Sequence, residues 1–182
     1  MTPPRPDRPR LEPLDPSTLD DETRRYVPGD ALNIFRTLAH HPKLLKRWLV
    51  FGSHVLAKST LPARERELAI LRTGWRCGSE YEFGQHTVIG LASGISRQEI
   101  EALTRPLEDH PWSDADRVLL RAVDELHDDH CIGDDTWGAL AGRWGTEQLL
   151  DLIFAVGQYT LVSMALNTLG VQRDEGVPGF PS

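Results

Sequence analysis

Cysteine is scarce in this chain of 182 residues, which holds only Cys77 and Cys131. Two cysteines are too few for a scaffold built on disulfides, and they fit a protein of a reducing compartment. Positive charge is also in short supply, because 20 Lys and Arg stand against 27 Asp and Glu, for a formal net charge of -7. Binding to a phosphate backbone depends on clustered Lys and Arg, so we expect no nucleic-acid partner.

The start of the chain lacks the apolar run that a secretory signal needs, so we expect a cytoplasmic protein. Six prolines in the first sixteen residues favour an extended arm over residues 1–29, either solvated or laid over a neighbouring subunit. Residues 152–169 are uncharged for about the length of a bilayer span. Gln158, Ser163 and Asn167 inside this segment favour a helix buried on all sides, so we expect no membrane contact.

Sustained alternation of apolar and polar residues, which is typical of strands, is also missing. Apolar residues return every three or four positions instead. We therefore expect an all-α fold, a compact bundle of about seven to eight helices that forms one domain over residues 30–173, followed by an irregular tail over 174–182. The expected helix starts are Asp30, Pro42, Pro62, Ser79, Ser96, Ser113 or Asp114, Asp134 and Thr146.

The polar stretch RCGSEYEFGQH lies between two apolar segments. A helix turns about 100° per residue, so Ser79, Glu82 and His86 would share one stripe. Cys77 joins this stripe only if the chain before Ser79 is not helical. Glu67 lies at the edge of the apolar face of the preceding helix, and antiparallel packing would set it against the stripe. A carboxylate beside an imidazole in a partly dry site is the usual equipment for moving protons.

Two other interpretations compete with a catalytic cluster. Ion pairs between neighbouring helices are often structural, and the geometry alone names no reaction. His127 and His130, with acidic residues around them, suggest a metal site. They lack the HExxH pattern, however, and lie where a helix is expected to end, so we expect no metal ligands.

The segment RERELAILRTGWRCGSEYEFGQHTVIGLASGISRQEIEAL strongly resembles the carboxymuconolactone decarboxylase family, which includes the alkylhydroperoxidase D proteins. The resemblance covers residues 32–170 in general pattern and is sharpest from 62 to 103. Peroxidase members of this family carry a Glu, then eleven residues, a Cys, two residues, a second Cys, three residues and a His. The corresponding positions here are Glu67, Ser79, Glu82 and His86. Both cysteines are absent, so the chain is similar to a branch without the redox pair.

The resemblance implies an alkylhydroperoxidase D-like fold and a carboxy-lyase that acts on a small carboxylated lactone or oxo-acid without a cofactor. Loss of carbon dioxide leaves an electron pair that must be protonated, which calls for a positioned acid. We expect His86 to supply or relay the proton, Glu67 to orient His86, and Glu82 to act as a second proton carrier. Tyr81 and Gln85 are expected to donate hydrogen bonds to substrate oxygens. Further expected substrate-binding residues are Ser79, Trp75 and Cys77.

Several alternatives stay open at this point. The same residues would serve an isomerase, a cyclase or a lactone hydrolase of a secondary pathway. A thiol-dependent alkylhydroperoxidase would need Cys77 and Cys131 to replace the lost pair. A helical oligomer without catalysis is the third alternative. Both the resemblance and the nearly all-apolar helix expected over 149–169 imply a homo-oligomer. The resemblance suggests a trimer or a hexamer.

Overall fold

The computed structural model describes residues 4–181, and all regular structure in that range is helical. The described α-helices are α1 (Asp21–Arg24), α2 (Asn33–Leu38), α3 (Pro42–Ala57), α4 (Ala63–Arg76), α5 (Glu80–Ala92), α6 (Arg97–Ala102), α7 (Asp114–Asp128), α8 (Asp134–Ala141) and α9 (Thr146–Leu169). Short 3-10 turns at Pro16–Thr18 and Leu107–Asp109 precede α1 and α7. The prediction of an all-α fold is confirmed.

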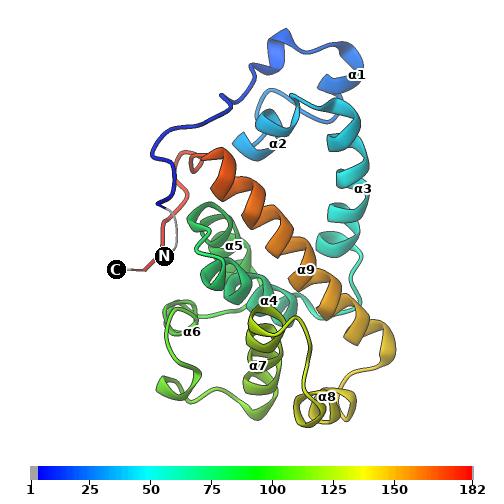
Figure 1. Ribbon diagram of the computed structural model, residues 1–182, viewed down its shortest axis with the longest axis vertical. Coiled ribbons are helices and arrows are strands. Elements are labelled where there is room, and N and C mark those ends of the chain that lie inside the picture. The colour runs from blue at the N-terminus through cyan, green and yellow to red at the C-terminus, as the bar shows by residue number, and fades with distance from the viewer. Residues whose placement is uncertain (1–3, 182) are drawn as a thin grey trace.

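Helix α4 lies at the centre of the molecule and packs against α5, α7 and α9 (Figure 1). Every residue of α4 from Glu67 to Gly74 is buried, because neighbouring helices cover it on all sides. Gly74 allows the close approach of α5, since a Cβ there would lie 3.3 Å from the Phe83 backbone nitrogen. Side chains of α4 and α5 therefore meet in the interior of the fold.

Local sequence signals set several helix starts, whereas a distant residue sets that of α2. Pro42 is the first residue of α3, and Ser96 forms the expected capping box with Glu99 at the start of α6. The expected start at Asp30 is wrong: α2 begins at Asn33, whose backbone N–H donates to Asp174 Oδ1 over 2.9 Å. A carboxylate 141 positions away thus satisfies the first turn of α2.

The N-terminal arm lies on its own domain. Residues 4–15 have no regular structure, and the backbone N–H of Arg10 donates to the Leu169 carbonyl at the end of α9 (2.7 Å). The Leu14 carbonyl accepts from Arg36 Nε of α2 (2.9 Å), and Val27 is fully buried among residues of α2 and α3. Leu14, Leu19 and Tyr26 thus pack within the same chain, whereas Leu11 is exposed.

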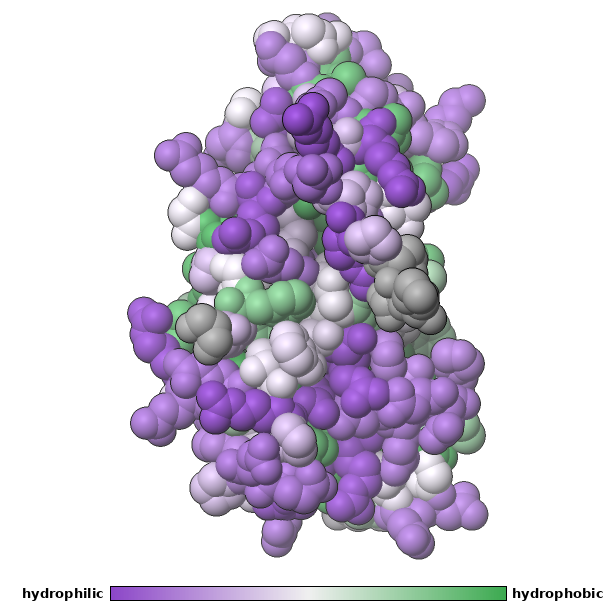
Figure 2. Space-filling view, turned by 60° about the vertical axis from the view of Figure 1, so that its left-hand side comes forward, coloured by the Kyte–Doolittle hydropathy of each residue, from purple (hydrophilic) through white to green (hydrophobic). Residues whose placement is uncertain are grey.

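The C-terminal tail is irregular, as expected, and packs across α5. A Cβ on Gly84 would collide with the Pro178 carbonyl oxygen, so only glycine admits the tail at this position. The Phe180 ring makes edge-to-face contacts with Trp75 and Phe83, at centroid distances of 5.0 and 5.2 Å. The surface on the side of the chain ends is mostly hydrophilic (Figure 2).

Helix α9 crosses the molecule diagonally (Figure 1). Its length and composition would suit a membrane span, and half of its most apolar window is buried inside the fold. The expectation of burial on all sides is wrong for the single chain. Large apolar side chains on the side away from α4 are exposed: Leu150, Phe154, Leu161 and Met164.

Candidate active site

His86 of α5 lies between two carboxylates in the interior. Its Nδ1 is 2.6 Å from Glu67 Oε2, and its Nε2 is 2.9 Å from Glu82 Oε1. Glu67 comes from α4, and Glu82 lies one turn earlier on α5, as the i, i+4 spacing requires. All three side chains are at least nine-tenths buried. The close packing of α4 on α5 thus places Glu67 in contact with His86, as expected from the sequence.

Opposite charges balance in this cluster. Arg66 Nε lies 3.2 Å from Glu67 Oε1, so a guanidinium and an imidazolium face two carboxylates. Burial lowers the pKa of His86, but the hydrogen bonds and charges of Glu67 and Glu82 outweigh it and raise this pKa to about 9. His86 is therefore an imidazolium at neutral pH, and both of its ring nitrogens carry protons.

A cavity of about 140 Å³ adjoins this cluster. Apolar side chains of α2, α3 and α9 form most of its wall, and Glu82 and His86 contribute charged groups. Glu67 does not reach the cavity and contacts it only through His86. An apolar pocket with a few convergent polar groups is the usual form of a small-molecule site.

Two further polar residues of the cavity wall, Gln158 and Tyr159, come from α9. Within residues 4–181, neither the Gln158 amide nor the Tyr159 hydroxyl makes a hydrogen bond, although both side chains are buried. The Tyr159 ring meets His86 edge-on, with centroids 4.7 Å apart. Burial, with the charges of Glu82 and Glu67, raises the pKa of Tyr159, so its hydroxyl keeps its proton. The sequence analysis did not predict that these two residues belong to the site. The presence of a polar residue, Gln158, in an otherwise apolar helix could have indicated it.

Tyr81 and Gln85 also touch the cavity, but their donors are engaged by the C-terminal tail. The Tyr81 hydroxyl donates to Asp174 Oδ2 (2.6 Å), and Gln85 Nε2 donates to the same oxygen (2.8 Å). A tyrosine has one hydroxyl proton, so Tyr81 has none for a substrate while Asp174 is in place. The tail therefore alters the role that we expected for Tyr81, whereas Gln85 keeps a second amide proton.

The remaining expected substrate-binding residues do not line this cavity. Ser79 is fully buried just before α5, and its hydroxyl has no hydrogen-bond partner in the described chain. Trp75 packs edge-to-face on Phe180. Cys77 Sγ lies 3.9 Å from His127 Nδ1 on α7. Ser79 and Cys77 belong to the connection between α4 and α5, and the tail packs on Trp75.

Neither cysteine is arranged for peroxide chemistry. Cys77 and Cys131 are both free thiols, and Cys131 is exposed on the surface. Burial raises the pKa of Cys77, which favours the neutral thiol over the nucleophilic thiolate. Among residues 4–181, no group of three or more His, Cys, Asp and Glu side chains is placed to hold a metal ion, around His127 and His130 or elsewhere.

The helical arrangement is that of the alkylhydroperoxidase D-like fold. Residues 42–125 match the carboxymuconolactone decarboxylase family. This match agrees with the resemblance of the sequence to that family. No curated protein matches the chain in sequence.

Solved structures share the fold at low sequence identity. An uncharacterized peroxidase-related protein from Ralstonia eutropha JMP134, described as an alkylhydroperoxidase AhpD core, superposes with a TM-score of 0.81 at 18% identity, over 92% of this chain and 93% of that one. A peroxidase-related protein from Silicibacter sp. TM1040 gives 0.81 at 15% identity, over 96% and 98%. A cysteine-to-alanine variant of the debrominase Bmp8, in complex with 2,3,4-tribromopyrrole, gives 0.77 at 13% identity, over 93% and 94%.

Proposed function

We propose that the chain is an acid–base enzyme of the decarboxylase type, which acts on a small carboxylated lactone or oxo-acid without a cofactor. The observation that supports this proposal is the hydrogen-bonded row of Glu67, His86 and Glu82, which is buried at one end and reaches the cavity at the other. A purely structural ion pair would not need a third ionisable group at the wall of an apolar pocket.

The row suggests a direction for proton movement. His86 carries a proton on Nε2, 2.9 Å from Glu82 Oε1, and its transfer makes Glu82 a carboxylic acid at the cavity wall. When the bond to the departing carboxylate breaks, its electron pair stays on the substrate carbon as carbon dioxide leaves. Glu82 then protonates that carbon. Glu67 holds the imidazole in place through Nδ1 and is the positioning residue of the row.

The polar groups of α9 supply substrate contacts in this proposal. The Gln158 amide and the Tyr159 hydroxyl line the cavity together with Glu82 and His86, and they are suited to a substrate oxygen that gains negative charge. Preorganised donors in a dry site stabilise such charge without reorganisation when the reaction occurs. They take the role that we had expected of Tyr81.

Release of carbon dioxide from a panel of carboxylated lactones and β-oxo acids tests this proposal. We expect release by the wild type, and a loss of about 100-fold or more in His86→Ala and Glu82→Gln, because each removes one member of the proton path. Cys77→Ser is the matched control, since Cys77 lies outside the cavity.

All variants are compared at the same verified oligomeric state. Full decarboxylation by His86→Ala would contradict the proposal. Hydroperoxide consumption that disappears in Cys77→Ser would favour the thiol-dependent alternative instead.

A further inference from the structure

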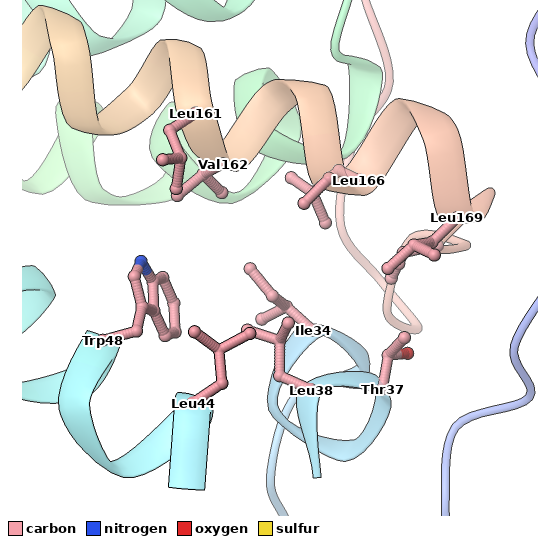
Figure 3. Close-up of a pocket in the computed structure, with 11 residues that line it drawn as sticks. Ile34, Thr37, Leu38, Leu44, Trp48, Leu161, Val162, Leu166 and Leu169 are labelled. Carbon is pink, nitrogen blue, oxygen red and sulfur yellow. The ribbon is translucent and has the colours of Figure 1, made fainter. Parts of the chain in front are cut away.

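A second cavity, of about 110 Å³, lies between α9 and the pair α2 and α3. Figure 3 shows Leu161, Val162, Leu166 and Leu169 of α9 facing side chains of α2 and α3 across it. All lining side chains other than Thr37 and Trp48 are pure hydrocarbon, and none of them carries a charge.

The two cavities adjoin. Ile34, Trp48 and Val162 line both of them, so the apolar cavity and the pocket beside Glu82 and His86 meet at these three side chains. The combined space is polar at one end and apolar at the other. Such a space suits an amphipathic molecule with an oxygenated head and a hydrocarbon arm.

We propose that the apolar cavity binds a hydrocarbon arm of the substrate, of about five carbon atoms, while the head lies against Glu82 and His86. An apolar cavity of roughly 150 Å³ holds a benzene ring, so 110 Å³ is enough for an arm of about this size. The inference rests on the proposed function for the chemistry of the head. It adds the substrate class: lactones or oxo-acids that carry an alkyl chain.

Water is a poor occupant of this cavity. A buried water needs two to four polar partners, and the wall offers little beyond the Thr37 hydroxyl and the Trp48 indole N–H. Thr37 is 2% exposed, and its hydroxyl has no partner in the described chain. The rest of the wall is hydrocarbon, which suits a hydrocarbon arm.

Equilibrium binding of γ-butyrolactones with unbranched alkyl groups of one to seven carbons at the γ carbon tests the inference. These probes have an oxygenated head but no carboxylate to lose, so calorimetry measures binding without turnover. Affinity should rise about fourfold per added methylene up to about five carbons and then level off, because each methylene leaves water until the cavity is full.

Variants locate the arm. Ala165→Phe fills the cavity and should abolish the dependence on chain length, whereas the matched change Ala139→Phe, on the exposed surface of α8, should preserve it. Leu44→Trp is a second variant that should fill the cavity. Leu44 lines the cavity but is half-exposed, so its substitution should not disturb the hydrophobic core.

Affinities that are independent of chain length in the wild type would overturn the inference. So would an unchanged dependence in both filling variants. If Ala165→Phe instead alters the assembly of subunits and no probe shows a dependence on chain length, the cavity belongs to a contact between copies and the inference is wrong. A dependence on chain length without any decarboxylation would leave the arm site standing and refute only the proposed reaction.

Discussion

Two carboxylates flank one imidazole in the core, and this residue-scale arrangement couples protonation to folding. The raised pKa of His86, about 9 against 6.5 in an unfolded chain, means that the folded state holds this proton more tightly. The stabilisation is therefore fully present below pH 6.5 and is lost as the pH rises through 9. A shift of this size corresponds to about 3 kcal/mol of the free energy of unfolding.

Urea denaturation at pH 6 to 10 checks this coupling. The wild type should lose stability over that range, and His86→Asn should lose less over the same range, since it has no imidazole to titrate. Parallel profiles for the two proteins would show that His86 does not bind its proton more tightly in the folded state.

Glu67 offers a second test at the same scale. Its carboxylate accepts from His86 Nδ1, so Glu67→Gln removes one of the two charges that raise the pKa of His86. We expect the pKa of the imidazole to fall by about one unit or more, as NMR titration of the ring would show. Glu65→Gln, on the same helix but without contact to His86, should leave this pKa unchanged. An unaltered pKa in Glu67→Gln would contradict the positioning role.

The residues of the row could be found from the sequence because they depend on local geometry. Glu82 and His86 are four positions apart on one helix, and Glu67 precedes them on a helix that had to pack nearby. The hydrogen bond from Tyr81 to Asp174 could not be predicted, because Asp174 lies 93 positions away and no periodicity indicates that contact. Antiparallel packing of the two helices predicted that Glu67 lies beside His86, and the resemblance to the family supported this prediction. Neither the packing nor the spacing of these residues identified a reaction.

At the scale of elements, the packing of the C-terminal tail on α5 depends on one glycine, Gly84. Gly84→Ala should displace the tail, because the added methyl would occupy the position of the Pro178 carbonyl oxygen. We expect faster proteolysis of the tail and a lower free energy of unfolding, by about 1 to 3 kcal/mol. The tail holds Tyr81 and Gln85 through Asp174, so its displacement should also free these side chains toward the cavity.

The matched control is Gly138→Ala in α8, where an added Cβ meets nothing within 4 Å. This change should stabilise the protein by about 0.5 to 1 kcal/mol, because alanine favours a helix interior over glycine. Equal effects of the two alanines on proteolysis would refute the close contact of the tail with α5.

At the scale of the whole molecule, one apolar face of α9 is exposed to solvent. The sequence alone could not predict which face of the helix this is. The length and apolar character of α9 were readable, whereas the exposed side depends on which helices pack around it. Leu150, Phe154, Leu161 and Met164 recur every three, four or seven residues on that side. Phe51 of α3 extends the face, since its ring makes an edge-to-face contact with Phe154 at 6.1 Å. We propose that a second copy of the chain covers this surface, within a trimer or a hexamer.

A charge placed in the middle of this surface tests the assembly. Phe154→Glu should convert the oligomer to monomers in sedimentation experiments, because the contact would bury an unpaired carboxylate. Val88→Glu makes an equal change at an exposed apolar residue of α5 and should preserve the oligomer. A wild type that sediments as a monomer at micromolar concentration would refute the assembly. Loss of assembly in both variants would place the contact elsewhere. Because Leu161 belongs both to this surface and to the wall of the apolar cavity, assembly through α9 would also close the cavity that we assign to the substrate arm.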